Sequence, residues 1–211
     1  MKKKKVSDFL ALFLKEKKIK HIFGIIGSAN AHIFDSITRL NYTKIISVHH
    51  EQAAAMAMQY YYRASGKISA TLVTAGAGSL NPITGVVAAW ADSIPGIIIS
   101  GQESTKNIFK FKKMRMWGVQ GIDSTYMVSK VTKYANRIYN PKNIIYELEK
   151  GFDIALKDRP GPVWIDIPID IQGELVSEKN LKIYKPKFYT KKNSTKKKDL
   201  SKLSKLITSS K

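Results

Sequence analysis

Residues 70–82, ATLVTAGAGSLNP, decide the fold of this chain. The first five residues form an apolar run rich in β-branched side chains, which is typical of a strand. The small residues 75–79 predict a tight turn. Asn81 and Pro82 then predict the N-cap and first turn of a helix that runs to about Ala91. The stretch is therefore a strand, a turn and a helix in immediate succession.

The same alternation extends in both directions along the chain. Strand-like runs recur at residues 21–25, 44–48, 96–100 and 163–167, and the longest helix-like segments between them are residues 51–64 and 141–156. The run 96–100, GIIIS, is too apolar for an edge strand, which indicates burial on both faces. Strands separated by helices predict parallel pairing, so we expect an α/β fold with a three-layer, doubly wound, mostly parallel sheet. Residues 101–125 show no period and predict a long functional loop.

The chain has 211 residues, 44% of them apolar, which suits one domain and a tail. We expect this domain to occupy residues 1–175, followed by a Lys-rich linker over 176–198. Residues 199–211 begin an amphipathic helix that has nothing to pack against. We interpret this helix as the start of a truncated central domain.

The formal charge of +20 suggests nucleic acid as a partner, but the lysines concentrate at the two ends of the chain. Arginines and aromatic residues are not interleaved with them, so we expect a solvated charge excess and no nucleic-acid site. The sequence contains no cysteine and no run of about 20 apolar residues, so we expect no membrane span. No cleavage site follows the basic N-terminus, which predicts a cytoplasmic protein.

Ligands of open parallel sheets bind beyond the carboxyl ends of the strands. Three segments fall there: residues 24–30, 49–51 and 74–81. Glu51 follows an apolar strand and begins an Ala-rich helix, so we expect it to be shielded from water. A carboxyl group in such a place suits proton transfer, although an acid stabilised by the helix dipole fits the position equally well. The neighbouring His49 and His50 are interpreted as structural.

Glycines in residues 76–79 lie after a strand, as in nucleotide-binding loops. However, Asn81 replaces the third glycine of a dinucleotide fingerprint, and the Lys-Ser/Thr pair of a P-loop is absent. This pattern alone therefore favours a plain tight turn over a phosphate site.

Five segments together resemble a known family. They are residues 50–54 (HEQAA), 62–67 (YRASGK), 74–81 (TAGAGSLN), 92–95 (DSIP) and 100–102 (SGQ). In this order and spacing they resemble the catalytic large subunits of acetolactate synthases, which depend on thiamine diphosphate. The resemblance covers about residues 6–174, the first of three domains in that family, and implies its pyrimidine-binding domain.

The resemblance also implies roles for individual residues. Glu51 matches the catalytic glutamate that hydrogen-bonds a ring nitrogen of the cofactor's aminopyrimidine and thereby promotes loss of the thiazolium C2 proton. The cofactor then attacks a 2-keto acid, which loses carbon dioxide and is joined to a second carbonyl compound. Gln120 matches a glutamine near the reacting carbon. The positions implied to bind the cofactor are Ile26, Gly27, Glu51, Thr74, Ala77 and Asn81.

Three positions depart from the family pattern. Ile25-Ile26 replaces Tyr-Pro, Ala77 replaces the proline of Gly-Pro-Gly, and Val119 replaces a phenylalanine. Val119 lies where the family places substrate, which suggests another keto acid or an aldehyde acceptor in place of the acetolactate reaction.

The Gly-Asp-Gly…Asn motif that holds the diphosphate and Mg²⁺ in this family does not occur here. The resemblance therefore implies that Mg²⁺, and any FAD, bind through domains missing from this chain, and that no metal site lies on it. We expect the chain to act as a homo-oligomer or with a chain that carries the diphosphate-binding domain. A catalytically incomplete fragment, a split-enzyme subunit and a non-catalytic binding module remain alternatives.

Overall fold

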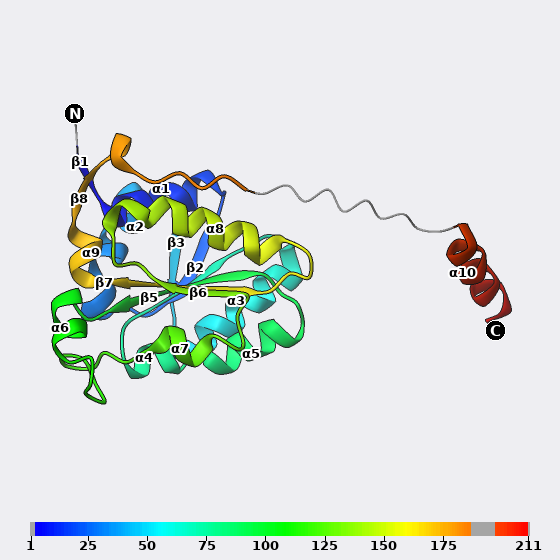
Figure 1. Cartoon of the computed structure of the whole chain (residues 1–211), viewed down its shortest axis with the longest axis horizontal. Coiled ribbons are helices and arrows are strands. Elements are labelled where there is room, and N and C mark those ends of the chain that lie inside the picture. Colours follow the sequence, from blue (N-terminus) through cyan, green and yellow to red (C-terminus); the bar gives the residue numbers. More distant parts are fainter. Residues whose placement is uncertain (1–2, 187–196, 211) are drawn as a thin grey trace.

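A computed structural model describes residues 3–186 and 197–210. Its centre is a sheet of six strands in the order β3-β2-β4-β5-β7-β6, and every neighbouring pair is parallel. The strands are β2 (His21–Gly24), β3 (Lys44–Ser47), β4 (Ala70–Val73), β5 (Gly96–Gln102), β6 (Tyr134–Arg137) and β7 (Pro162–Pro168). This confirms the predicted α/β fold with a doubly wound parallel sheet (Figure 1).

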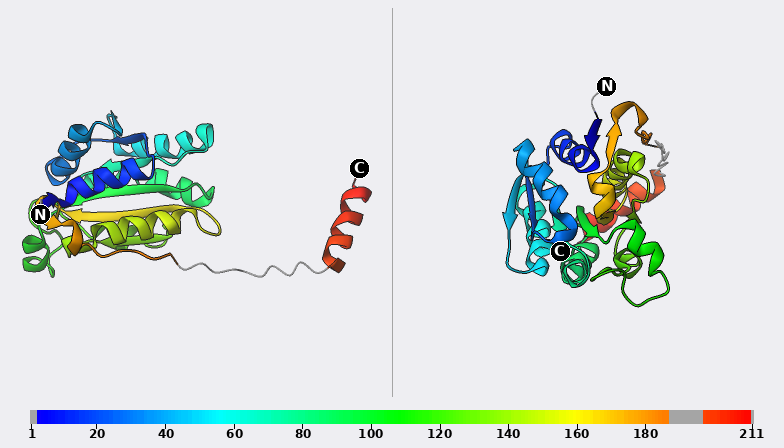
Figure 2. Two further views of the ribbon diagram at one scale, coloured as in Figure 1. Left: turned by 90° about the horizontal axis from the view of Figure 1, so that it is seen from above. Right: turned by 90° about the vertical axis from the view of Figure 1, so that its left-hand side faces the viewer.

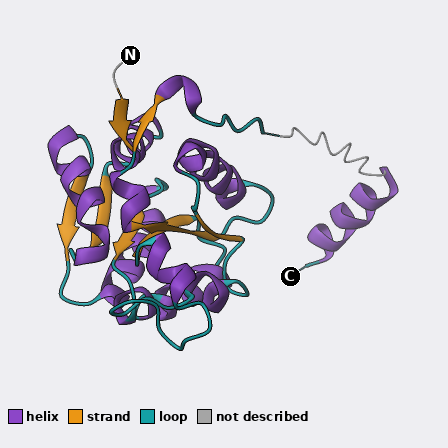
Figure 3. Cartoon of the chain, turned by 60° about the vertical axis from the view of Figure 1, so that its left-hand side comes forward, coloured by secondary structure: helices purple, strands orange, loops and turns teal. Residues whose placement is uncertain are grey.

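Helices cover both faces of the sheet and make three layers (Figures 1 and 2). One face carries α1 (Val6–Glu16), α2 (Ala31–Leu40) and α8 (Ile144–Leu156). The other carries α3 (Glu51–Ser65), α5 (Ile83–Ala91) and α7 (Ser124–Val128). Figure 3 shows the strands between the purple helices. Two separate apolar cores follow from this arrangement, one on each face of the sheet.

The central strands are buried along their whole length. All seven residues of β5 and all seven of β7 are shielded from solvent, and β5 lies between β4 and β7. This confirms the prediction that the run 96–100 is covered on both faces. Trp164 of β7 is fully buried and belongs to one of the two apolar cores.

Three local predictions differ from the structure. Residues 101–125 contain a short helix, α6 (Thr105–Lys110), and a bridge between Trp117 and Gly121 instead of an unstructured loop. The edge strand β6 was not predicted, because its sequence, YANR, lacks an apolar run. Asn81 does not cap the helix that follows, because a four-residue helix, α4 (Ala77–Leu80), precedes it and α5 begins only after Pro82.

Shorter elements complete the description. Strands β1 (Lys3–Lys5) and β8 (Leu175–Ser177) form an antiparallel pair, and α9 (Ile169–Gly173) follows β7. Single 3-10 turns occur at η1 (Ser28–Asn30), η2 (Pro141–Asn143) and η3 (Glu178–Asn180). A helix, α10 (Lys197–Ser209), lies where the sequence predicts one, and part of the expected linker, residues 187–196, falls outside the described residues. None of the described helices has the length and apolar character required to cross a lipid bilayer.

A buried polar cluster ties the edge strand β6 to the centre of the sheet. The fully buried Asp166 accepts hydrogen bonds from Ser100 Oγ (2.5 Å), Gln102 Nε2 (3.1 Å) and Arg137 Nε (2.5 Å). Burial raises the pKa of the Asp166 carboxyl, and the Arg137 guanidinium opposes that shift. Arg137 also bonds Asp123 at 3.0 Å, so one guanidinium links β6, β7 and the segment before α7.

The cluster generates a stability prediction. Arg137→Met should lower the free energy of unfolding by about 3–5 kcal/mol, because it leaves the Asp166 charge buried without its counter-ion. Arg63→Met, at the half-exposed pair with Asp92, is the matched control and should cost no more than about 1 kcal/mol. Urea denaturation of the three proteins measures both values. Equal losses in the two variants would contradict a special role for the buried pair.

Candidate active site

The candidate site lies where the strand order reverses. From β2 the chain passes outward to β3 and then returns to β4 on the other side of β2. The loops after β2 and β4 therefore meet at the carboxyl edge of the sheet, which is where open α/β sheets bind their ligands. A Cβ placed on Gly27 would lie only 2.6 Å from Cβ and Oγ1 of Thr74, so these two loops touch and Gly27 has no room for a side chain.

Glu51 is the first residue of α3 and is only 9% exposed. Its Oε2 accepts a hydrogen bond of 2.8 Å from Asn81 Nδ2. Its Oε1 faces Gly78, since a Cβ on Gly78 would lie 3.1 Å from that oxygen and 2.7 Å from Cγ2 of Thr74. The carboxyl group is thus withdrawn from water, as predicted, and is held against the loop that follows β4.

Glycine and small residues shape this loop. Gly76 has φ +67° and ψ −133°, which favours glycine, and a Cβ there would lie 2.4 Å from the carbonyl oxygen of Gln120. Ser79 Oγ donates a 2.8 Å hydrogen bond to the Gly76 carbonyl oxygen and closes the turn. The short α4 that results turns Asn81 back towards Glu51, which explains why the Asn81 side chain does not cap α5.

Gln120 reaches the same loop from a distant part of the chain. Its Nε2 donates to the carbonyl oxygen of Ala75 at 3.2 Å. The backbone N–H groups of Val119 and Gln120 both donate to Oε1 of Glu103, at 3.2 and 3.3 Å. Glu103 therefore fixes the position of Gln120. No local pattern in the sequence indicates this role, because Glu103 contacts backbone groups that lie 16 and 17 positions further along the chain.

A pocket of about 250 Å³ opens beside Gln120 at the same edge of the sheet. Its lining residues come from the loops after β2, β5 and β7 and from the segment before α7: Ser28, Ala29, Gln102, Glu103, Val119, Gln120 and Ile169. Glu51 does not line this pocket. Gln120 therefore stands between the pocket on one side and the turn that holds Glu51 on the other.

The structure brings five of the seven predicted site residues together: Gly27, Glu51, Thr74, Asn81 and Gln120. The other two, Ile26 and Ala77, are exposed side chains on the same two loops, and Ile26 is 62% exposed. His49 and His50 are exposed, and His50 Nδ1 accepts the backbone N–H of Gln52 as the N-cap of α3.

Two observations bear on a bound group. Thr74 Oγ1 is buried and has no hydrogen-bond partner among the described residues. Gly27 and Gly78 pack directly against Thr74, and Gly78 also lies against Oε1 of Glu51, so the hydroxyl and the carboxylate oxygen lie on the same small patch of backbone. A ligand with hydrogen-bonding nitrogens would find two partners there, Thr74 Oγ1 and Glu51 Oε1. Within the described residues, no group of three His, Cys, Asp or Glu side chains is placed to hold a metal ion.

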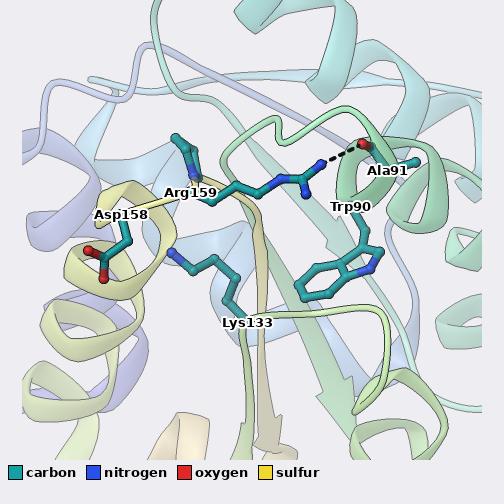
Figure 4. Close-up of a pocket in the computed structure, with 6 residues that line it drawn as sticks. Trp90, Ala91, Lys133, Asp158 and Arg159 are labelled. Atoms are coloured by element: carbon teal, nitrogen blue, oxygen red, sulfur yellow. Dashed lines mark hydrogen bonds between the residues drawn. The ribbon is translucent and has the colours of Figure 1, made fainter. Parts of the chain in front are cut away.

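A second pocket, of about 350 Å³, lies at the opposite, amino edge of the sheet (Figure 4). Trp90 is 41% exposed there, and Lys133 and Arg159 lie near it. Arg159 already bonds Ser93 Oγ at 2.6 Å and the Ala91 carbonyl oxygen at 3.3 Å. Asp158 balances part of the positive charge, so this pocket carries no unsatisfied cluster comparable to the candidate site.

Known proteins are similar to this chain in sequence. A family model described as thiamine pyrophosphate enzyme, N-terminal TPP binding domain, matches residues 4–127. The acetolactate synthase large subunit of Haemophilus influenzae is 36% identical over 172 residues, which are 81% of this chain and 29% of that protein.

Two further relatives agree. The probable acetolactate synthase large subunit of Methanocaldococcus jannaschii is 37% identical over 82% of this chain and 30% of its own length. For the isozyme 3 large subunit of Escherichia coli the identity is 34%, over 78% of this chain and 28% of that protein. The chain thus spans less than a third of the length of these relatives. The resemblance predicted from the sequence is confirmed, and the chain belongs to the family of N-terminal TPP-binding domains of thiamine pyrophosphate enzymes.

Proposed function

We propose that this chain provides the pyrimidine-binding half of a thiamine diphosphate site, with Glu51 as the carboxylate that contacts the aminopyrimidine ring. The observation that carries the proposal is the position of Glu51, 9% exposed at the strand-order reversal, with Oε2 fixed by Asn81. Oε1 has no hydrogen-bond partner among the described residues and faces the space beside Gly78. A carboxyl group with one oxygen fixed and one available is suited to hold or pass a proton at a ring nitrogen.

The neighbouring residues have complementary roles in this proposal. Thr74 Oγ1, which is buried without a partner, offers the ring a hydrogen bond beside Glu51. Gly27 and Gly78 let the two loops pack closely against Thr74, and the turn at Gly76 holds the loop in place. Gln120, fixed through Glu103, separates this ring site from the pocket of about 250 Å³ and marks that pocket as the place for substrate. The cofactor, when bound, supplies the electron sink for decarboxylation of a 2-keto acid.

We infer that the complete enzyme is acetolactate synthase-like: it decarboxylates a 2-keto acid and joins the remaining fragment to a second carbonyl compound. Val119 lines the pocket and is 84% exposed, so a small aliphatic side chain stands where substrate would bind. The smaller side chain supports a keto acid or acceptor other than those of acetolactate synthesis. The chain would act in the cytoplasm, within a homo-oligomer or beside a chain that holds the diphosphate through Mg²⁺.

The half-site generates a binding prediction. Free thiamine, which carries the pyrimidine without the diphosphate, should bind the chain weakly, with a Kd on the order of 1 mM. At the Glu51 site, thiamine diphosphate should bind no more than about threefold tighter than thiamine at roughly 0.15 M salt, with or without Mg²⁺, because the Gly-Asp-Gly…Asn motif that holds the diphosphate does not occur in this sequence. Ligand-observed NMR measures both affinities.

Glu51→Gln should weaken thiamine binding, and His49→Gln, an exposed neighbour, is the matched control that should leave it unchanged. Tight, Mg²⁺-dependent binding of thiamine diphosphate by the chain alone would contradict the half-site. Equal thiamine affinity of the Glu51 and His49 variants would remove Glu51 from it.

A second prediction concerns proton transfer. With the diphosphate-binding domain added as a separate chain, Glu51→Gln should slow exchange of the cofactor's C2 proton by about 10²–10⁴-fold, the usual loss for a general acid or base. Proton NMR after a quenched deuterium pulse measures the rate. His49→Gln again serves as the control, and unchanged exchange in Glu51→Gln would disprove the assigned role.

A further inference from the structure

A pocket of about 430 Å³ lies at the amino edge of the sheet, away from the candidate active site. It is built from the turn between α1 and β2, the loop before β3, the turn between α3 and β4, and the end of α8. Its lining residues are Lys17, Lys18, Lys20, Tyr42, Tyr62, Gly66, Lys67, Ile68, Phe152 and Leu156. Four of these ten residues are lysines and none is an aspartate or glutamate, so the lining is positively charged.

Three of the four lysines are available to a ligand. Lys17 Nζ forms an ion pair of 2.7 Å with Glu149 and so is already neutralised. Lys18, Lys20 and Lys67 are exposed and have no ion pair within the described residues. Since Lys67 comes from a different turn, positive charge reaches the pocket from two sides. Like charges gathered around a concave surface repel one another, and a bound anion relieves that repulsion.

Aromatic and apolar side chains form the rest of the wall. Lys20 Nζ lies 3.9 Å from the centre of the Tyr42 ring, which orders this ammonium group by a cation–π contact. Tyr62, Ile68, Phe152 and Leu156 supply a surface against which a ring can pack. The pocket in Figure 4 differs in its charge, because Asp158 offsets its cations and Arg159 is already hydrogen-bonded.

We propose that this pocket binds a small polyphosphate anion, either an inorganic polyphosphate or a nucleotide, with the phosphates held by Lys18, Lys20 and Lys67. The pocket's volume suits a ligand of this size, and ammonium groups are effective point-charge partners for phosphate. The site is separate from Glu51, because its turns precede β2 and β4, whereas the candidate active site follows the same two strands. The proposal therefore does not depend on thiamine diphosphate binding.

Isothermal titration of the full chain with tripolyphosphate and with ATP, at roughly 0.15 M salt, tests the proposal. We expect saturable binding of one ligand per chain. The double variant Lys20→Gln/Lys67→Gln should weaken it about tenfold or more, since two charged contacts are lost. The control Lys142→Gln/Lys179→Gln removes the same charge from exposed positions outside the pocket and should change the affinity less than about twofold.

The two ligands distinguish the possible sources of the phosphates. Tighter binding of ATP than of tripolyphosphate, with the difference lost in Tyr62→Leu, would assign the site to a nucleotide, and equal affinities would assign it to inorganic polyphosphate. If the two double variants weakened polyphosphate binding equally, the binding would come only from the overall positive charge of the protein, and the proposal would be overturned. Binding that does not saturate would overturn it as well. Thiamine affinity, measured on the same variants, should stay at the wild-type value.

Discussion

The parallel pairing of β2 with β4 is the constraint on which the candidate site depends. Because the chain leaves β2 for β3 and only then returns to β4, the two loops that follow these neighbouring strands diverge in sequence but meet in space. Their contact is so close that Gly27 and Thr74 leave no room for a further methyl group. The topology of the sheet thus brings the two loops of the candidate site together before any side chain contributes to it.

The environment of Glu51 is set by the short stretch of backbone around Gly76 and α4. The left-handed conformation at Gly76 permits a four-residue helix, and that helix aims Asn81 at the carboxylate instead of at the N-terminus of α5. One oxygen of Glu51 is therefore oriented in advance, so under the proposed function less conformational entropy would be lost when a ring contacts the other. The second oxygen and Thr74 Oγ1 have no hydrogen-bond partner in the described part of the chain, and both are therefore available to a ligand.

The sequence predicted the parts of the structure that follow from local pattern. Apolar runs marked the strands at residues 70–74 and 96–100, and five short motifs in order carried the resemblance that implies roles for Glu51 and Gln120. Strand β6 (Tyr134–Arg137) was not predicted, because it is held in place by the contact between Arg137 and Asp166. These two residues are distant in the sequence, so no local periodicity indicates their pairing. The contact of Glu103 with the backbone of Gln120 was not predicted for the same reason. The prediction that Asn81 caps a helix was wrong, although Asn-Pro is a strong helix-start signal. The Asn81 side chain instead donates a tertiary hydrogen bond to Glu51.

The two outermost strands of the main sheet have a consequence for how the protein behaves among its own copies. β3 and β6 are each only four residues long, while the fully covered β5 and β7 each have seven. A short outer strand offers few unpaired backbone groups to a neighbouring molecule, and Lys44 adds an exposed positive charge on one of them. The most apolar segments are thus kept in the interior, which limits edge-to-edge association of the folded protein.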